Sequence, residues 1–279
     1  MIDVRAHVFQ GIDQEFRFAI TSNQKGVFAG SEKLLKTAEE IKLKNLWAAA
    51  DGMLLSEKTT VFKASGDPLQ VTLAEEKLLG LIGKPSGVAT SARKMVEAAG
   101  GRIKVVCGAW KKVFPETKEE LRQAIAIGGA GIRMAEEPFV YLDKNYARML
   151  GGIGRAVKRA VTLPGRTVVI QLRGEFGPIA DEANEAVEAG AGILMVDTGR
   201  IADLQAVVKA GTDGNWRKRV KIGFAGDVTA EKLAALIEAG ADIVDVGRAI
   251  IDAPILDFRL DIKQGILRRQ QITRGEEGG

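Results

Sequence analysis

Two related stretches decide the fold: VEAGAGILMVD at residues 187–197 and IEAGADIVDVG at residues 237–247. They share Glu-Ala-Gly-Ala at an offset of 50 residues, from 188 to 238. In each, the pattern predicts a helix that ends at the glycine and passes directly into a buried strand. Four other apolar stretches predict strands separated by helical sequence: KVVCG, FVYL, TVVIQL and KIGFAG. Because short, similarly spaced strands that alternate with helices are typical of parallel βαβ units, we expect a (β/α) barrel after residue 102.

The first hundred residues have a different pattern, in which short strand-like runs (FRFAI and TTVFKA) surround a helix expected at 31–41 with Ser31 as its N-cap. A second helix is expected to end at Pro85, and a third to begin at Ser86 or Thr90. This α+β pattern predicts three parts: an α/β domain at 1–101, a barrel at 102–265, and a polar tail at 266–279.

Composition limits the classes of function. The chain has 279 residues, 46% hydrophobic, with a net charge of +4 and a pI of about 9.1. Its Lys and Arg residues are interleaved with Asp and Glu, which argues against a nucleic-acid protein and leaves phosphorylated small molecules as partners. The sequence shows no leader segment and no apolar run of about 18 residues, so we expect a cytoplasmic protein without a membrane span.

One cysteine and one histidine exclude a structural zinc site within one chain. We expect His7 to be structural or solvent-facing, because no partner for a general base accompanies it. Cys107 follows the apolar run Val105-Val106 and is expected to be a small buried residue rather than a nucleophile.

In a barrel, the active site lies at the carboxyl ends of the strands. The candidate residues that follow predicted strands are Trp110, Lys111, Lys112, Asp197, Gly226, Asp227, Gly247 and Arg248. The glycine loops after the last two strands predict a phosphate site, although the glycines alone could simply form tight turns. Asp227 argues against phosphate at that position, since a carboxylate next to a phosphate needs a cation between them, whereas Arg248 favours it.

The residues near the first strand allow two interpretations each. Lys111 and Lys112 either have a functional role at the mouth of the barrel or are two solvated lysines on a loop. Trp110 either stacks on a flat ring or covers the rim of the barrel. Arg133, in GGAGIRM, is either a ligand-binding or a plain surface cation.

Residues 26–101 resemble the N-terminal half of quinolinate phosphoribosyltransferases, in the order GVFAG, ADG, GD, an AE-containing helix and SGVAT. Residues 246–262, VGRAIIDAPILDFRLDI, are similar to that family's closing segment VGALTHSAPALDISLDI. The resemblance implies an α/β sandwich domain followed by an incomplete (β/α) barrel, and a homodimer whose sites are completed by the partner chain. It also implies a pentosyltransferase of pyridine nucleotide biosynthesis that uses phosphoribosyl pyrophosphate and Mg²⁺ and needs no organic cofactor.

Several positions of the family's motifs differ here. Where the family has D-T-R-K-T this chain has Gly108-Ala109-Trp110-Lys111-Lys112, and where it has N-H-R this chain has Gly131-Ile132-Arg133. Asp143 stands where the family has the lysine of L-I-K-D-N-H, and Lys144 comes one place later. Glu76 replaces the arginine of the AER helix, and Gln171 replaces the acid of the E-V-E strand. Asp197 keeps the aspartate of L-D-N, and Ala225-Gly226-Asp227 stands for S-G-G.

Carried over residue by residue, the resemblance implies catalytic roles for Lys111, Asp197 and Lys144, with Asp197 also the candidate Mg²⁺ ligand. It implies that Trp110, Lys112, Arg133, Asp143 and Gln171 bind substrate, and that Gly226, Asp227, Gly247 and Arg248 bind phosphate. With Gln171 in place of an acid, stabilisation of a positively charged ribosyl centre is expected from Asp197, assisted by Asp143 or Asp227.

The lost cations are those expected to bind the two carboxylates of quinolinate, at about 1.5–3 kcal/mol for each charge-assisted bond. Their loss argues against quinolinate as the acceptor and favours another pyridine carboxylate or a related planar heterocycle. The alternative hypothesis is a descendant of the family that binds a phosphorylated ligand without transfer, or that catalyses other chemistry on the same scaffold.

Overall fold

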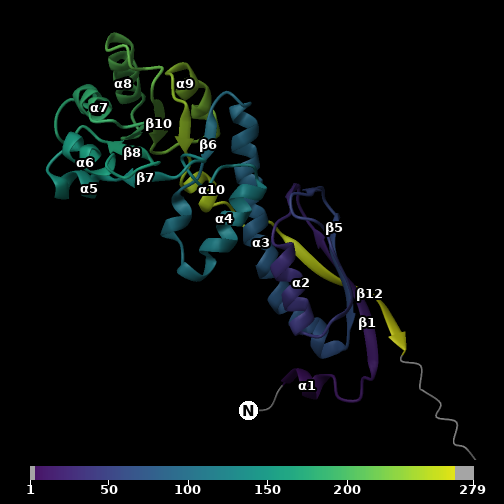
Figure 1. Ribbon diagram of the computed structural model, residues 1–279. Helices are drawn as coiled ribbons and strands as arrows, with labels where there is room; N and C mark the ends of the chain where they lie inside the picture. The colour runs from purple at the N-terminus through teal and green to yellow at the C-terminus, as the bar shows by residue number, and fades with distance from the viewer. Residues whose placement is uncertain (1–3, 268–279) are drawn as a thin grey trace, which may run out of the picture. The chain divides into compact units, whose positions relative to one another are not determined.

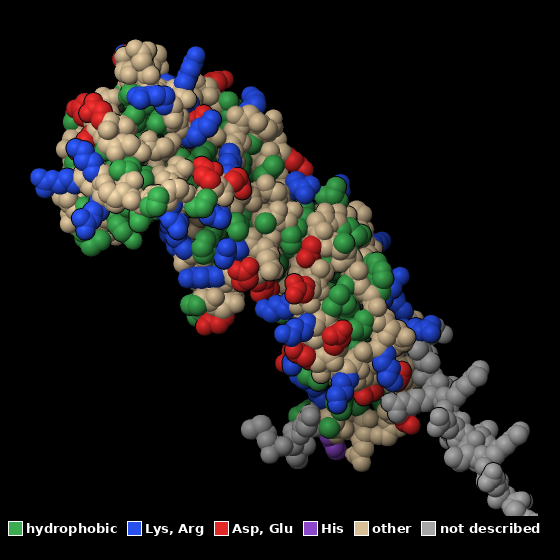
Figure 2. All heavy atoms as spheres, viewed as in Figure 1, with side chains coloured by type: hydrophobic (Ala, Val, Ile, Leu, Met, Phe, Trp, Pro, Cys, Tyr) green, Lys and Arg blue, Asp and Glu red, His purple; other side chains and the backbone are tan. Residues whose placement is uncertain are grey.

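The computed structural model describes residues 4–267, which form two compact units (Figure 1). The first contains residues 4–87 and 254–267, and the second is Val88–Ala253. Helix α3 (Pro68–Ala99) contributes residues to both units. Within the described residues, no helix is long and apolar enough to cross a membrane. On the face drawn in Figure 2, basic and acidic side chains are intermixed, and the basic ones form no continuous stripe there.

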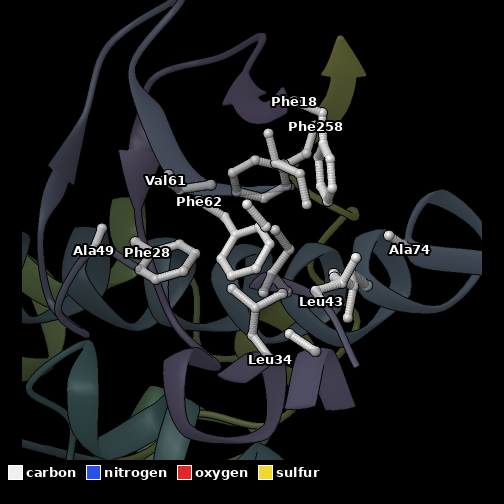
Figure 3. Packing of buried hydrophobic residues seen from close by; sticks show 14 of the residues in the cluster. Phe18, Phe28, Leu34, Leu43, Ala49, Val61, Phe62, Ala74 and Phe258 are labelled. Carbon is white, nitrogen blue, oxygen red and sulfur yellow. The ribbon is translucent and has the colours of Figure 1, made fainter. Parts of the chain in front are cut away.

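The first unit is an antiparallel sheet covered by helices. Its strand order is β12-β1-β5-β3, with the bounds Phe258–Leu267, Gln14–Ser22, Thr60–Gly66 and Lys44–Ala48. A short pair, β2 (Gly26–Val27) with β4 (Leu54–Leu55), lies outside this sheet. A buried cluster joins Phe18, Phe62 and Phe258 from the strands to Leu34 of α2 (Ser31–Glu40) and Leu78 of α3. Figure 3 shows part of this cluster, with Phe18, Phe62, Phe258 and Leu34 labelled. Helix α1 (Val4–Val8) carries the exposed His7.

Two helix boundaries differ from the sequence prediction. Helix α2 is capped by Gly30 rather than Ser31, because the Asp51 carboxylate accepts hydrogen bonds from the backbone nitrogens of both residues, at 2.9 and 3.0 Å. Gly30 has φ 107°, and a Cβ there would lie 2.8 Å from the carbonyl oxygen of Leu81. The predicted end of a helix at Pro85 is wrong, since α3 continues through it.

Tertiary hydrogen bonds explain why α3 tolerates Pro85. The buried Ser86 hydroxyl accepts a hydrogen bond from the backbone nitrogen of Ala29 at 3.0 Å, so it joins the helix to a neighbouring segment instead of capping it. The carbonyl of Gly83 accepts from the nitrogen of Leu256 at 3.0 Å. Local sequence signals for a break are therefore outweighed by contacts with segments distant in the chain.

The predicted end of the barrel at residue 265 also differs from the structure. Strand β12 pairs antiparallel with β1, with Ile20 opposite Leu260 and Ser22 opposite Phe258. The alternation of buried Phe258 with exposed Arg259 suits a strand with one face on a core, and that core belongs to the first unit. Of the predicted polar tail, residues 268–279 lie outside the described residues.

The second unit contains a curled parallel sheet that forms an incomplete barrel, as predicted. Its strand order is β6-β11-β10-β9-β8-β7, with the bounds Lys104–Val106, Ile243–Asp245, Lys221–Ala225, Ile193–Asp197, Thr167–Leu172 and Phe139–Leu142. An isolated parallel bridge joins Val106 to Gly131 beyond the β6 edge. The interior is filled by a buried cluster that includes Val169, Met195, Ala225 and Ile243.

Helices follow the strands of this unit. Their bounds are α4 Lys118–Ile127, α5 Lys144–Leu150, α6 Ile153–Ala160, α7 Ile179–Glu188, α8 Ile201–Asp213, α9 Leu233–Glu238 and α10 Arg248–Ile251. Three 3₁₀ turns add to them: η1 Ala109–Lys112, η2 Pro115–Thr117 and η3 Ala230–Lys232. The two Glu-Ala-Gly-Ala stretches link α7 to β9 and α9 to β11, which confirms the prediction that each ends a helix and leads into a buried strand.

Candidate active site at the barrel mouth

Two carboxylates lie level with each other at the carboxyl ends of the barrel strands. Asp197 ends β9 and Asp245 ends β11, and both pair in register with Ala225, the last residue of the strand between them. Because side chains alternate along a strand, Asp197 and Asp245 share the inward face with Met195 and Ile243 of the buried interior. The small side chain of Ala225 separates two acidic groups at the mouth.

Asp245 was not among the residues predicted from sequence. Its Oδ1 accepts a hydrogen bond from the backbone nitrogen of Gly108 at 2.8 Å. Burial raises the pKa of the Asp245 carboxyl and the nearby Asp197 raises it further, whereas the Gly108 hydrogen bond and the charges of Lys111 and Lys112 lower it. The one sequence signal that could have found it is its place as the last, inward-facing residue of a short apolar strand.

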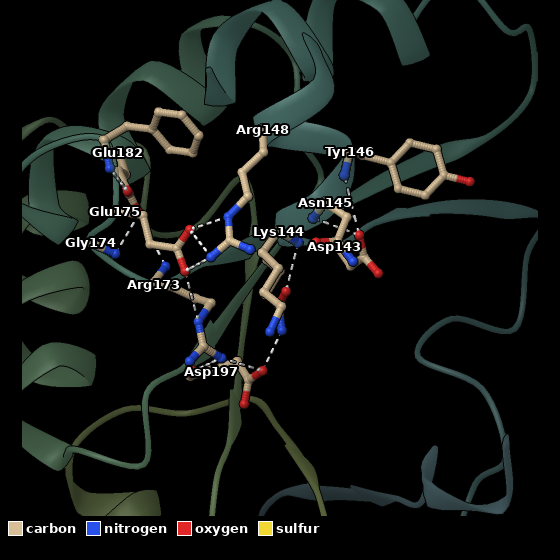
Figure 4. Close-up of polar contacts among 12 residues, drawn as sticks. Asp143, Lys144, Asn145, Tyr146, Arg148, Arg173, Gly174, Glu175, Glu182 and Asp197 are labelled. Atoms are coloured by element: carbon tan, nitrogen blue, oxygen red, sulfur yellow. Dashed lines mark hydrogen bonds and ion pairs between the residues drawn. The ribbon is translucent and has the colours of Figure 1, made fainter. Parts of the chain in front are cut away.

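Asp197 is held by two neighbouring side chains (Figure 4). The Gln171 amide donates a hydrogen bond to Asp197 Oδ2. The Arg173 guanidinium donates to the same oxygen at 3.1 Å and to the backbone carbonyl of Asp197 at 2.9 Å. Gln171 also accepts a hydrogen bond from the backbone nitrogen of Lys144 at 2.8 Å, so three predicted site residues come together here.

The polar network continues outward through residues that sequence reasoning missed. Arg173 contacts Glu175 at 3.3 Å, and Glu175 accepts two hydrogen bonds from Arg148, each at 2.9 Å. The loop that carries Arg173 and Glu175 is anchored by the buried carboxylate of Glu182, which accepts from the backbone nitrogens of Arg173, Gly174 and Phe176. Glu182 therefore fixes the position of Arg173 and, through it, of Asp197.

Lys111 is near enough to Asp245 for its charge to lower the pKa of that carboxyl. Its Nζ is 5.6 Å from the centre of the Tyr141 ring, on the far strand β7. Burial raises the pKa of the Tyr141 hydroxyl, and the nearby carboxylates of Asp245, Asp197 and Asp143 raise it further. Lys112 is exposed on the same turn. Lys111, Tyr141 and the two carboxylates thus belong to one electrostatic cluster.

Trp110 packs against a basic side chain within the protein. The guanidinium of Arg122, on α4, lies 4.8 Å from the centre of the indole ring. Both the indole N–H of Trp110 and Nε of Arg122 are buried without a hydrogen-bond partner among the described residues. Arg133 makes a similar contact with Phe139, at 5.4 Å, and is exposed.

Asp143 and Lys144 begin helix α5. The carboxylate of Asp143 caps the helix by accepting from the backbone nitrogens of Asn145 and Tyr146, at 2.9 and 3.2 Å. Lys144 is the first helical residue and is partly buried. Asp143 therefore has a structural task that the sequence prediction of a substrate-binding role did not include.

The predicted phosphate-binding residues lie in the two loops that follow β10 and β11. Gly226 has φ 108°, and a Cβ there would lie 2.6 Å from the backbone of Gly199, so the loops after β9 and β10 touch. The carboxylate of Asp227 pairs with Arg248 at 2.9 Å, and both side chains are largely exposed. At Gly247 a Cβ would meet open space. Arg248 is therefore paired with Asp227, the carboxylate whose charge argued against a phosphate site in this loop.

Two cavities of about 360 and 530 Å³ occur near the amino ends of the strands, at the opposite end from the mouth. They share Gly101, Ile103, Lys104 and Glu136. Lys104 forms an ion pair with Glu136 at 2.7 Å across this region. The strand-end residues described above do not line either cavity.

Two family models match the chain. Residues 3–86 match the N-terminal domain of quinolinate phosphoribosyl transferase, and residues 88–261 match its C-terminal domain. The chain belongs to the quinolinate phosphoribosyl transferase family. Its membership explains why the two units occur together and in this order.

Relatives in this family cover most of the chain. A probable nicotinate-nucleotide pyrophosphorylase (carboxylating) of Archaeoglobus fulgidus is 29% identical over 250 residues, which cover 88% of this chain and 93% of that protein. One from Methanothermobacter thermautotrophicus is 26% identical, covering 88% and 87%. The structure of the nicotinate-nucleotide pyrophosphorylase from Francisella tularensis has the same fold, with a TM-score of 0.79 at 21% identity and coverage of 94% and 90%.

Proposed function

We propose that this member of the quinolinate phosphoribosyl transferase family is a pentosyltransferase that moves a phosphoribosyl group from phosphoribosyl pyrophosphate to a pyridine carboxylate or a related planar nitrogen heterocycle. The observation that carries the proposal is the mouth cluster, in which Asp197 and Asp245 flank Ala225 beside Lys111. Family membership supports the donor, and the altered cation set supports an acceptor other than quinolinate.

The reaction breaks the bond between C1 of the ribose and the pyrophosphate oxygen, and the electron pair leaves with pyrophosphate. Positive charge then develops at the ribosyl centre, where fixed carboxylates stabilise it more than they stabilise the ground state. Asp197 and Asp245 are the inward-facing acids at the mouth that are placed for this. Lys111 and Lys112, on the adjacent turn, would hold the departing pyrophosphate.

The residues at the mouth fit a Mg²⁺ ion that is bound largely by the substrate. Mg²⁺ in such sites is held by one or two carboxylates together with phosphate oxygens and water. Within the described residues, no group of three or more His, Cys, Asp or Glu side chains could hold a metal. Asp197 would supply the protein's carboxylate, and when bound the ion would neutralise charge on the pyrophosphate.

The acceptor side of the mouth is less basic than the family motifs imply. Trp110, in the place of a family arginine, is covered by Arg122, and Asp143, in the place of a lysine, is occupied as a helix cap. Arg133 remains as an exposed cation over Phe139. We expect this arrangement to accept a flat ring with one carboxylate or none.

Titration calorimetry with phosphoribosyl pyrophosphate and Mg²⁺ tests the donor. We expect binding by the wild-type protein, a loss of at least about tenfold in affinity for Lys111→Ala, since a charge-assisted contact contributes about 1.5–3 kcal/mol, and no change for Lys218→Ala. Lys218 is an exposed control just before β10, at the opposite end of the strand from the mouth. Pyrophosphate release is then measured with quinolinate, nicotinate and other heterocycles. Absence of donor binding would overturn the proposal and favour a binding protein on the same scaffold.

We also propose that the protein is a homodimer. Four exposed apolar side chains, Tyr146, Met149, Leu150 and Phe176, lie on α5 and on the loop after β8, which the Arg148–Glu175 ion pair joins. Such a group of exposed apolar side chains is typical of an interface. Light scattering on the wild-type protein and on Met149→Glu should give a dimer and a monomer respectively; a wild-type monomer would contradict the proposal.

A further inference from the structure

Within residues 4–267, the carboxylate of Asp245 has one oxygen without a hydrogen bond and no cation bound to it. Its Oδ1 accepts the hydrogen bond from Gly108, and among the described residues no other hydrogen bond or ion pair to this carboxylate occurs. A Cβ on Gly108 would lie 3.2 Å from Oδ2, so the absence of a side chain there leaves that oxygen room. Asp197 differs in that the amide of Gln171 and the guanidinium of Arg173 both donate to its Oδ2, so a cation already offsets its charge.

We propose that Asp245 is a catalytic base that removes a ring N–H proton from the acceptor, and that the acceptor is therefore an N–H heterocycle of the lactam type, in which the attacking nitrogen itself carries the proton. This inference rests on the proposed function and narrows its class of acceptor. A pyridine nitrogen attacks with a free lone pair and needs no base, whereas an N–H nitrogen must lose its proton as it bonds to carbon.

The step balances without any further reactant. The ring nitrogen forms a bond to C1 of the ribose while the bond from C1 to the pyrophosphate oxygen breaks, and pyrophosphate leaves with that electron pair. The proton of the ring N–H passes to Oδ2 of Asp245. The nucleotide product is neutral at the ring, unlike the pyridinium product of a pyridine acceptor.

The position of Asp245 suits this role. It stands level with Asp197 across Ala225, whose methyl group is the only side chain between them in register, so a substrate atom held above Ala225 faces both acids. Asp197 would face the ribosyl centre and Asp245 the incoming nitrogen. Two acids with different hydrogen-bond partners can then perform different tasks.

The surroundings of Asp245 favour a base rather than a permanently ionised anchor. The titratable and charged groups that face it are Lys111 and Lys112 from η1, Asp197 from β9, Tyr141 from β7 and Cys107 after β6. Burial is the largest influence and raises the pKa of its carboxyl, which strengthens it as a base. The hydrogen bond from Gly108 and the charge of Lys111 oppose that rise and keep the carboxylate available.

The test measures pyrophosphate release from phosphoribosyl pyrophosphate and Mg²⁺ with two sets of acceptors. Quinolinate and nicotinate lack a ring N–H, whereas every ring nitrogen of uracil and of 2-pyridone carries one. The variants are Asp245→Asn, Gly108→Ala, which crowds Oδ2, and Asp252→Asn, an exposed control after α10. Rates are taken as kcat and KM between pH 5 and 9, and folding of each variant is checked by circular dichroism.

We expect turnover with at least one N–H heterocycle, and a wild-type kcat that rises with pH through a single ionisation. Asp245→Asn should lower kcat by about 10²- to 10⁴-fold, leave KM within about threefold, and abolish the rising limb. Gly108→Ala should also lower kcat. It tests the role of Asp245 even if Asp245→Asn does not fold. Asp252→Asn should behave as wild type.

Turnover with pyridine acids alone would overturn the inference and leave the proposed function intact. An equal loss of kcat with both sets in Asp245→Asn would also overturn it, because a purely electrostatic role for Asp245 does not depend on a ring proton. If calorimetry detects no donor binding and no acceptor gives pyrophosphate, the proposed function fails together with the inference.

Discussion

Arg173 binds Asp197 at two points, the side-chain Oδ2 at 3.1 Å and the backbone carbonyl at 2.9 Å. Arg173 comes from the end of β8 and Asp197 from the end of β9, so the contact ties together two adjacent strand ends at the mouth. The side-chain ion pair is about one-third exposed on both sides, so we expect it to position Asp197 rather than to stabilise the fold.

Removal of this contact should impair the chemical step. We expect Arg173→Ala to lower kcat by about 10- to 100-fold, because small displacements of a reacting or stabilising group have effects of that size. Thermal stability should change little. Arg219→Ala, an exposed arginine before β10, serves as the control in steady-state kinetics. A higher kcat in Arg173→Ala would show that the guanidinium restrains Asp197 rather than positions it.

Two substitutions of Asp143 separate its role as a helix cap from the effect of its negative charge. Asp143→Ala removes an N-cap with two hydrogen bonds and should lower the free energy of unfolding by about 1 kcal/mol, whereas Asp143→Asn keeps an acceptor and should lose much less. Urea denaturation measures both. If the negative charge of Asp143 serves the substrate, Asp143→Asn will instead lose activity while it retains stability.

The glycine pair Gly226 and Gly247 should respond differently to the same substitution. Gly226→Ala requires a left-handed backbone and places a Cβ 2.6 Å from Gly199, so we expect a loss of about 1–3 kcal/mol in the free energy of unfolding. Gly247→Ala meets open space around the new methyl, so it should lose less stability than Gly226→Ala. Denaturation of the two variants side by side tests this difference. Similar losses would contradict the close contact at Gly226.

Cys107 should be inert in the folded protein. It is fully buried, as predicted, and burial raises the pKa of its thiol from 9.0 to about 11, so the reactive thiolate is scarce at pH 8. We expect labelling by a thiol reagent to be slow in the native state and at least about a hundred times faster in denaturant, where burial is lost. Rapid native labelling at pH 8 would contradict this placement.

Sequence patterns were most informative where local and tertiary preferences agree. The Glu-Ala-Gly-Ala stretches predicted two helix-to-strand junctions because a glycine helix stop and an apolar strand occur together. The parallel strands followed from their apolar composition, and with them the location of Asp197, Lys111 and Gly226 at the mouth. These are features that neighbouring residues determine.

Features that depend on distant segments were missed. Pro85 reads as a helix stop, but contacts of Ser86 with Ala29 and of Gly83 with Leu256 hold one continuous helix. Asp245 lies in the stretch 237–247, but nothing in that pattern marks it as a site residue, and its importance comes from the pairing of β11 beside β10 and from the distant Gly108. The sequence pattern alone does not identify such spatial neighbours. The strand order and register of the sheet do.

The pairing of β12 with β1 bears on how the chain is made. Strand β1 spans Gln14–Ser22 and its partner Phe258–Leu267, so all the barrel strands are synthesised between them. During translation the first unit lacks one strand of its sheet until the barrel has left the ribosome, and β1 has an unpaired edge in the meantime. The barrel can therefore fold first on the ribosome, although it is encoded second.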